Sequence, residues 1–200
     1  LIDGSRVRAQ ETVTCPAGTT IAVRNLFFNT PARRQFLKSD PVELKHIIDE
    51  FQRVALAHPG IAFTFAHNDQ ELFHLDAGNE RQRVVALFGR KYDERLVPVE
   101  EATDAVSIAG FTGKPEFAKR SRGEQFFFVN RRYIRSGYLE HAVRSAYDEL
   151  VTRENYPSWF LFIEIDPARI DINIHPTKTE IKFRDDRVVY AIVHAAVRRA

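Results

Sequence analysis

The sequence predicts an α+β protein built from two sandwiches of helices packed on sheets. Segments with a two-residue apolar repeat alternate with helical segments in both halves of the 200-residue chain, which is typical of strands covered by helices. The small residues at 77–79 (Ala-Gly-Asn) mark a break between the halves. Residues 125–129 (Gln-Phe-Phe-Phe-Val) are nearly continuously apolar, as in a strand covered on both faces. We therefore predict domains at 1–78 and 79–200.

The first domain is predicted to open with two strands. They lie at 5–14 and 19–28 and turn at 16–18 (Pro-Ala-Gly). A short helix should follow, because Thr30 suits an N-cap and Pro31 suits the first helical position, where its missing N–H costs nothing.

A longer helix is predicted from Asp40 to about residue 57. Asp40 suits its N-cap, and Pro41 and Glu43 complete the form of a capping box. Residues 58–60 (His-Pro-Gly) end it. Its apolar stripe is Leu44, Ile47, Ile48, Phe51 and Val54.

A hairpin and a helix join the two halves. Segments 61–67 and 70–75 alternate around Asn68-Asp69, a pair that favours a tight two-residue turn. The helix at 80–88 should end at Gly89.

Besides the stretch 170–183, the second domain is predicted to contain four strands and two further helices. The strands lie at about 96–100, 105–112, 124–130 and 159–165, and the helices at 137–150 and from about 187. The expected inner residues of these helices are Leu139, Ala142, Val143, Ala146 and Leu150 in the first, and Val188, Ile192, Val193 and Ala196 in the second.

The stretch from residue 170 to residue 183 has the most unusual pattern. It begins as a strand with isoleucines on one face and Asp171, Asn173 and His175 on the other, until Pro176 ends the ladder. Lys178 follows on a polar loop, and a second strand runs through Ile181 and Phe183. A polar face that leads to a lysine suggests contact with another domain or with an anionic ligand.

Composition excludes several classes of protein. No apolar run approaches the roughly 20 residues that a membrane helix needs, so we expect no membrane partner. The single cysteine, Cys15, excludes an internal disulfide and a multi-cysteine zinc site, so we expect a reducing cytoplasm. No metal site is expected at His175, because no ligand stands at metal spacing beside it. The chain lacks methionine, so we expect it to be part of a longer protein.

Basic residues are concentrated in one segment of the second half, although the net charge is only +2. A local basic patch favours a polyanion, but a solvated surface with loosely paired charges is about equally consistent with it. Between residues 114 and 135 there are two acidic residues and seven basic ones, namely Lys114, Lys119, Arg120, Arg122, Arg131, Arg132 and Arg135.

Each polar candidate also has an ordinary structural interpretation. Lys178 alone is more often a solvated charge than a cation on a phosphate. Asp171, Asn173 and His175 fit a buried polar network between domains better than a catalytic cluster. The pair Arg131-Arg132 ends a buried strand, which suits phosphate binding or ordinary ion pairs. No phosphate-binding glycine motif or nucleophile arrangement is present, so the chain shows no complete active site.

Three segments together resemble the MutL family of DNA mismatch repair proteins. They are 18–37 (from Gly-Thr-Thr-Ile to Asn-Thr-Pro-Ala-Arg-Arg-Gln-Phe-Leu), 127–132 (Phe-Phe-Val-Asn-Arg-Arg) and 171–178 (Asp-Ile-Asn-Ile-His-Pro-Thr-Lys). The resemblance implies the end of a GHKL-type ATPase α/β sandwich at 1–78, the kind shared by gyrase B, heat-shock protein 90 and histidine kinases. A ribosomal protein S5 domain 2-like transducer domain would follow at 79–200.

The resemblance also implies roles for single residues. Thr19 matches a threonine near the adenine pocket, and Lys178 matches a lysine that reaches the γ-phosphate of ATP. Gln35 departs from the family, in which a basic residue can stand at this position. The implied DNA-binding residues are Arg132, Arg53 and Lys38, and the basic residues Arg131, Lys119 and Arg120 join them as candidates.

The whole protein is then expected to bind ATP and Mg²⁺ and to form a homodimer. Its expected partners are DNA, a MutS-like mismatch-recognition protein and a downstream nuclease or helicase, in the nucleoid-associated cytoplasm of a bacterium. In the family the catalytic Glu, the Mg-binding Asn and the glycine-rich lid lie upstream of Leu1. We therefore expect this chain alone to be inactive and to bind neither ATP nor Mg²⁺.

Two other classes fit part of the pattern. One is a non-enzymatic RNA- or protein-binding module with an S5-like fold. The other is the equivalent region of a type II topoisomerase or of a heat-shock-90-like chaperone, in which Asn-Thr-Pro-Ala-Arg-Arg is not expected.

Overall fold

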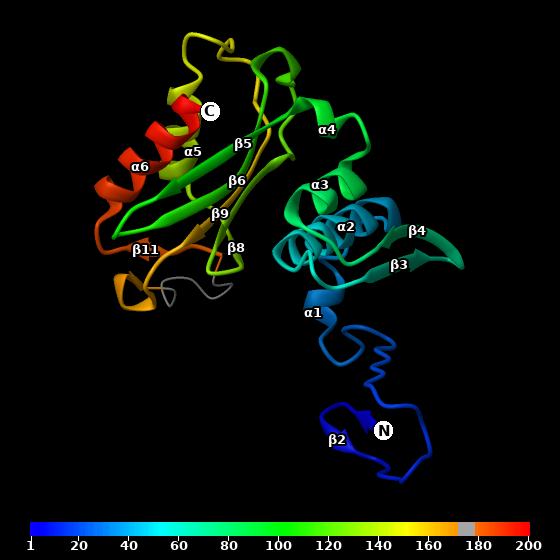
Figure 1. The fold of residues 1–200 in the computed structure, drawn as a ribbon. Helices are drawn as coiled ribbons and strands as arrows, with labels where there is room; N and C mark the ends of the chain where they lie inside the picture. The colour runs from blue at the N-terminus through cyan, green and yellow to red at the C-terminus, as the bar shows by residue number, and fades with distance from the viewer. Residues whose placement is uncertain (172–178) are drawn as a thin grey trace. The chain divides into compact units, whose positions relative to one another are not determined.

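The computed structural model describes residues 1–171 and 179–200, and the chain divides into two compact units, Leu1–Ile48 and Asp49–Ala200 (Figure 1). The second unit is a mixed sheet with helices, which confirms the predicted α+β class. The expected domain boundary after residue 78 stays a prediction. No helix in the described part of the chain is both long enough and apolar enough to cross a membrane.

The first unit contains little regular structure. Strands β1 (Ile2–Asp3) and β2 (Arg6–Val7) form an antiparallel pair, and α1 (Pro31–Arg34) is a single helical turn. The predicted strands at 5–14 and 19–28 are therefore wrong, apart from residues 6 and 7. A strand needs a hydrogen-bonded neighbour and an apolar face to bury. Residues 19–28 have no strand partner among the described residues, and Ile21 and Val23 are exposed.

Both helix starts differ in detail from the expected capping. Pro31 occupies the first position of α1 as predicted, but the side chain of Thr30 makes no capping hydrogen bond. Helix α2 (Asp40–Ala57) already includes Asp40, and the carbonyl of Ser39 accepts the first helical hydrogen bond, from the N–H of Glu43. The N-cap therefore lies one residue earlier than expected. The Glu43 carboxylate accepts from the N–H of Lys38 at 2.7 Å.

The second unit is organised around a five-stranded sheet with the order β5-β6-β9-β7-β8. All neighbours are antiparallel except β7 and β9, which are parallel and joined by a crossover through α5. The four predicted strands are confirmed, and β7 is buried on both faces as expected. The strands are β5 (Leu96–Ala102), β6 (Ser107–Gly113), β7 (Gln125–Val129), β8 (Arg132–Ile134) and β9 (Trp159–Glu164).

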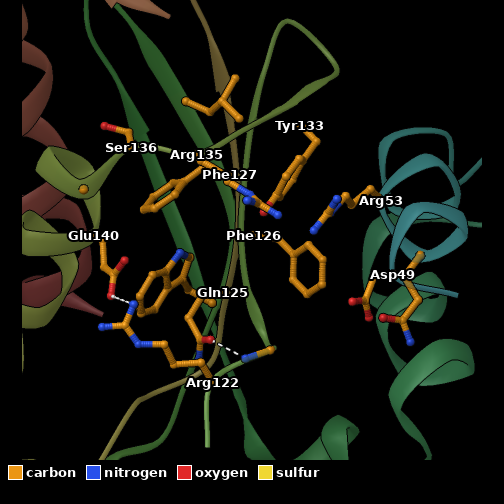
Figure 2. A pocket seen from close by; sticks show the side chains of 15 residues that line it. Asp49, Arg53, Arg122, Gln125, Phe126, Phe127, Tyr133, Arg135, Ser136 and Glu140 are labelled. Atoms are coloured by element: carbon orange, nitrogen blue, oxygen red, sulfur yellow. Dashed lines mark hydrogen bonds and ion pairs between the residues drawn. The ribbon is translucent and has the colours of Figure 1, made fainter. Parts of the chain in front are cut away.

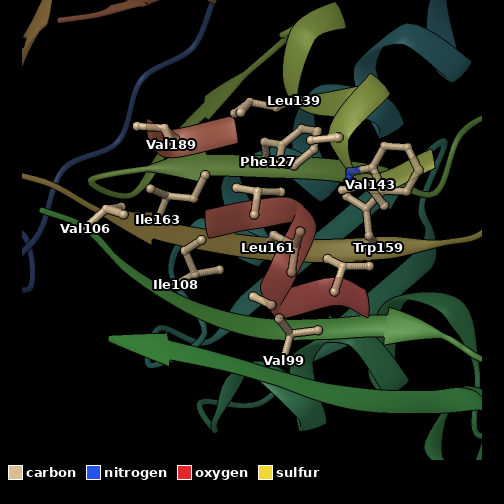
Figure 3. Packing of buried hydrophobic residues seen from close by; sticks show 14 of the residues in the cluster. Val99, Val106, Ile108, Phe127, Leu139, Val143, Trp159, Leu161, Ile163 and Val189 are labelled. Atoms are coloured by element: carbon tan, nitrogen blue, oxygen red, sulfur yellow. The ribbon is translucent and has the colours of Figure 1, made fainter. Parts of the chain in front are cut away.

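Helices α5 (Gly137–Ala146) and α6 (Asp186–Arg199) cover one face of this sheet (Figure 3). Their side chains pack against Phe127, Trp159 and Leu161. These residues belong to the first of two hydrophobic cores, one on each face of the sheet. Two predicted inner residues are wrong. Leu150 lies beyond the end of α5 and is exposed, and Val188 is exposed because the inner stripe of α6 is Val189, Val193, Ala196 and Val197.

Tyr147 explains why α5 stops early. The residue leaves helical geometry with φ −102° and ψ 1°, and its buried hydroxyl donates to the carbonyl of Gly113. The hydroxyl of Thr112 also bonds to Tyr147. Burial raises the pKa of Tyr147 from 10.0 to about 12, although the Thr112 hydrogen bond acts in the opposite direction.

The other face of the sheet carries a second core. Phe126, Phe128 and Phe160 alternate with residues of the first core and pack against the C-terminal end of α2 and its neighbours. These neighbours are β3 (Phe63–His67), β4 (Gln70–Leu75), α3 (Glu80–Phe88) and α4 (Tyr92–Arg95). The hairpin turn and the ends of α3 match the prediction: Asn68 and Asp69 have φ of 48° and 61°, Asn79 caps α3 and Gly89 ends it.

Arg83 connects the loops around this second core. Its side chain is 2% exposed, and its Nη2 donates to the carbonyls of Pro59 at 2.8 Å and Asp76 at 3.1 Å and also to that of Ile61. Burial lowers the pKa of Arg83 from its ordinary value, although the charge of Asp76 acts in the opposite direction. One buried guanidinium thus holds both ends of the β3–β4 hairpin to α3.

Short elements complete the unit. The 3₁₀ turns are Pro115–Phe117 and Pro167–Arg169. Strand β10 (Ile170–Asp171) pairs with β11 (Lys182–Phe183), so the described ends of the 170–183 stretch are strands, as predicted. Residues 172–178 lie outside the described part of the chain.

Candidate functional site

Strand β7 separates the basic residues that the sequence places close together. Lys119, Arg120 and Arg122 precede the strand, whereas Arg131 and Arg132 follow it. A five-residue strand spans roughly 15 Å. The basic segment therefore forms two groups at opposite ends of β7 and does not form one patch.

The β7–β8 hairpin presents two arginines at its tip. Asn130 and Arg131 have φ of 48° and 64°, so they form the two-residue turn between Val129 and Arg132. The Asn130 side chain donates to the carbonyl of Ile165 at 2.9 Å and accepts from its N–H at 3.0 Å. Arg131 and Arg132 are exposed, and their side chains make no ion pair with a described residue. Two arginines without an ion-pair partner among the described residues therefore lie on a turn that hydrogen bonds hold in place.

Acidic groups lie near one of these arginines. Arg131 lines an open hollow of about 600 Å³ together with Asp104, Glu164 and Asp166. Its local field is therefore less positive than the sequence alone suggests.

Lys119 is already occupied within the protein. Its Nζ donates to the hydroxyl of Tyr92 at 2.8 Å and forms an ion pair with Glu124. Burial lowers the pKa of Lys119, but its hydrogen bonds to Glu124 and Tyr92 and their charges outweigh this effect, so the pKa lies above its ordinary value. Arg120 beside it is exposed and has no ion-pair partner among the described residues.

A pocket of about 380 Å³ lies where β8 ends beside the start of β7. Figure 2 shows α2 with Asp49 and Arg53 on one side of the sheet, and α5 with Ser136 and Glu140 on the other. The rest of the lining is mainly aromatic or basic and comprises Arg122, Phe126, Phe127, Tyr133, Arg135 and Trp159, with Gln52, Gly123, Gln125, Ile134 and Gly137.

Two arginines of the pocket are held by neighbours. Arg53 lies over the ring of Tyr133 at 4.4 Å and forms an ion pair with Glu50. Arg122 pairs with Glu140 at 3.3 Å. A hydrogen bond to Tyr156 and the charge of Glu140 raise the pKa of Arg122. Arg53, a predicted DNA-binding residue, therefore lies in a different place from Arg131 and Arg132.

The remaining predicted residues for nucleotide binding, for DNA binding and for the interface network are only partly within the described structure. Thr19 and Lys38 are exposed in the unit Leu1–Ile48, and Asp171 is exposed on β10. Asn173, His175 and Lys178 lie outside the described residues. Within residues 1–171 and 179–200, no three His, Cys, Asp or Glu side chains form a potential metal cluster.

Sequence reasoning did not place Tyr133 and Arg135 in a site. A partial signal was present, because asparagine suits the first position of a two-residue hairpin turn, although arginine is not a typical second residue. That turn pairs Phe127 with Ile134 and so sets Arg135 opposite Phe126, at the pocket.

Comparisons with known proteins agree with this architecture. A family model described as "DNA mismatch repair protein, C-terminal domain" matches residues 84–200. The DNA mismatch repair protein MutL of Christiangramia forsetii is 58% identical over 199 residues, which cover 100% of this chain and 32% of the relative. The chain thus spans about a third of the length of the curated relatives that it matches.

Two solved structures share the fold. The N-terminal domain of a DNA repair protein matches with a TM-score of 0.72 and 20% identity, over 86% of this chain and 58% of that chain. The Aquifex aeolicus MutL ATPase domain complexed with ADP matches with a TM-score of 0.56 and 22% identity, over 86% of this chain and 55% of that chain. The fold and the relatives confirm the resemblance carried by the three sequence segments, and the chain belongs to the MutL family of DNA mismatch repair proteins.

Proposed function

We propose that this chain is the part of a mismatch repair protein that holds DNA by its phosphates, through the tip of the β7–β8 hairpin. The observation that carries the proposal is the pair Arg131 and Arg132, exposed and without ion-pair partners among the described residues, on a turn that Asn130 fixes to Ile165. A guanidinium on a fixed backbone matches phosphate geometry. Contacts of this kind position a protein on DNA without reading its sequence.

The other predicted DNA-binding residues differ in whether they already have a partner within the protein. Arg120 and Lys38 are exposed and can add to the electrostatic attraction, whereas Lys119 must first give up Glu124. Arg53 would contribute from α2, where Tyr133 and Glu50 hold its guanidinium. The hairpin arginines are therefore the main phosphate contacts in our proposal.

The DNA proposal can be tested by measuring duplex binding of the 200-residue chain against salt concentration. We expect the slope of log K against log salt to fall by about 0.9 for each phosphate contact that is removed. The double variant Arg131→Ala/Arg132→Ala should therefore lose about two units of slope and bind more weakly at low salt. Arg90→Ala removes an exposed arginine between α3 and α4 and serves as the matched control.

An unchanged slope in the double variant would contradict the proposal. Single-stranded DNA and RNA belong in the same assay. Preference for RNA over both forms of DNA would favour an RNA-binding module with an S5-like fold.

We further propose that the whole protein binds and hydrolyses ATP with Mg²⁺. In this ATP-binding site, Thr19 would lie near the adenine and Lys178 would contact the γ-phosphate. A related MutL ATPase domain is complexed with ADP, which supports nucleotide binding. Asp171, Asn173 and His175 would form the network that places Lys178 at the boundary near residue 78. The expected homodimer, the mismatch-recognition and nuclease partners and the nucleoid-associated location belong to the same proposal.

The nucleotide proposal predicts that Lys178→Ala lowers ATP turnover in a full-length protein that carries this chain. Lys182→Ala, an exposed lysine on β11, is the control. Equal turnover in the two variants would contradict the assignment of Lys178.

A further inference from the structure

We infer that a pocket of about 140 Å³ at the C-terminal ends of α5 and α6 is a docking site for a partner protein, which inserts one phenylalanine ring flanked by carboxylates. We call it the α5–α6 pocket. Val97 of β5, Pro115 after β6, Ala146 of α5 and Val197 of α6 line it. The inference goes beyond the proposed function, because it concerns a protein partner and a surface that the DNA proposal does not use.

The inside of the α5–α6 pocket is apolar. Ala146 and Val197 line it together with the ring of Tyr147. The hydroxyl groups of Tyr147 and Thr112 bond to each other, and Tyr147 also donates to the carbonyl of Gly113, so these polar groups need no partner from outside. A dry apolar cavity of roughly 150 Å³ in another protein binds benzene. The volume of the α5–α6 pocket therefore suits one phenyl ring.

Leu150 adds an uncovered apolar side chain to the rim of this pocket. Helical spacing predicts that it faces inward, but α5 ends at Ala146 and Leu150 is 65% exposed. The N–H groups of Leu150 and Val151 donate to the carbonyl of Tyr147 at 2.8 Å and 3.0 Å, which fixes the turn that carries the side chain. Covering an exposed leucine with an apolar group is favourable. Leu150 thus supports the same kind of occupant as the pocket beside it.

Two cations at the pocket select the charge of the occupant. Lys114 and Arg198 line it, and no acidic side chain of the described residues does. Neither cation has an ion-pair partner among the described residues, whereas the neighbouring Arg199 pairs with Glu101. Carboxylates beside the apolar anchor would complement the two cations. Complementarity of this kind favours the right partner and speeds its association.

The test measures the binding of a fluorescein-labelled peptide, Gly-Asp-Glu-Phe-Glu-Asp-Gly, by fluorescence anisotropy. A full-length protein that carries this chain is used, because Ala200 lines the pocket and the terminal carboxylate of the 200-residue chain would repel the peptide. We expect saturable binding. The same peptide with alanine in place of phenylalanine should bind at least about tenfold more weakly, since the burial of the ring is lost.

Charge reversal tests the two cations. Lys114→Glu/Arg198→Glu should weaken the phenylalanine peptide about tenfold, because two attractions become repulsions. Arg90→Glu/Lys91→Glu is the matched control, since it changes the net charge equally at two exposed residues between α3 and α4. The control should bind the peptide as the parent protein does. Circular dichroism checks that each variant is folded.

Leu150→Ser tests the apolar rim. It should weaken the peptide about fivefold, because the partner loses an apolar side chain to cover. Leu26→Ser changes another exposed leucine, with 58% of its surface accessible, and should leave the affinity unchanged.

Three results would overturn the inference. Equal affinity for the phenylalanine and alanine peptides would mean that charge alone attracts them. Equal affinity in the parent protein and in folded Lys114→Glu/Arg198→Glu would mean that the two cations play no part. Binding to the 200-residue chain but not to the full-length protein would mean that another part of the longer protein covers the pocket.

A competition with duplex DNA separates this inference from the DNA proposal. The variant Arg131→Ala/Arg132→Ala should bind the peptide as tightly as the parent protein, whether or not its DNA affinity falls. Displacement of the peptide from this variant by duplex DNA would assign Lys114 and Arg198 to DNA and contradict the protein partner.

Discussion

The two units of the chain have similar apolar patterns but differ in how they bury them. In Leu1–Ile48 no side chain is fully buried, and Ile21, Val23 and Phe36 are all exposed. In Asp49–Ala200 the alternating strands fill two cores, one on each face of the sheet. The comparison teaches that alternation predicts a strand only where a second strand and a covering layer are available to it.

The largest expected difference between the units comes from matched phenylalanine truncations. Phe160 is 0% exposed and packs with Phe126 and Phe88, whereas Phe36 is 76% exposed. Phe160→Ala should lower the free energy of unfolding by about 3–5 kcal/mol, and Phe36→Ala by less than about 0.5 kcal/mol. Urea denaturation followed by circular dichroism measures both. Similar losses in the two variants would show that Leu1–Ile48 contributes to a core.

Truncating Arg83 in the second unit and Arg8 in the first compares the two units through a buried and an exposed arginine. Arg83→Met should cost about 3 kcal/mol, because three part-buried backbone carbonyls lose a charged donor. Arg8 pairs with Asp3 at 3.2 Å in solvent, so Arg8→Met should cost less than about 0.5 kcal/mol. Thermal melts at matched pH report the difference. A stable Arg83→Met variant would mean that the β3–β4 hairpin does not depend on this side chain.

The smallest expected effect is a loss of folding stability at alkaline pH. It comes from a buried tyrosine in the second unit, and residues 1–48 contain no tyrosine. The pKa of Tyr147 rises from 10.0 to about 12 on folding, so the folded protein favours the neutral phenol. The resulting stabilisation is fully present below pH 10 and is lost as the pH rises toward 12. It amounts to about 2–3 kcal/mol.

The measurement is the difference in unfolding free energy between the parent chain and Tyr147→Phe, taken at several pH values from 9 to 11.5. All other residues are the same in the two proteins, so their contributions to this difference cancel. A constant difference across this range would show that burial of the Tyr147 hydroxyl does not affect stability.

Much of the second unit could be predicted from local signals. The turn at Asn68-Asp69, the cap at Asn79, the end at Gly89 and the apolar run 125–129 each depend on residues close in sequence, and the structure confirms all four. The end of α5 depends instead on Tyr147 reaching Gly113, which is 34 residues away. Such a long-range hydrogen bond leaves no periodic signal.

The candidate sites were only partly predictable for a related reason. The charge of residues 114–135 is visible in the sequence, but its division into two groups follows from the direction of β7. In the sequence, Lys119 and Arg131 are equally plausible as available cations. Only the fold shows that Lys119 is bound to Glu124 and Tyr92. The pocket depends on α2 and α5 lying on opposite sides of one sheet edge, which pattern reasoning could not anticipate.

The two hydrogen bonds between Asn130 and Ile165 couple the hairpin tip to the chain that enters β10. Any displacement of the tip must either carry residue 165 with it or break both bonds. By thermodynamic reciprocity, a ligand that shifts the tip and a ligand that shifts the segment after residue 165 change each other's affinity by the same factor. One asparagine side chain therefore sets an upper bound on the free energy that these two parts of the protein can exchange through this contact.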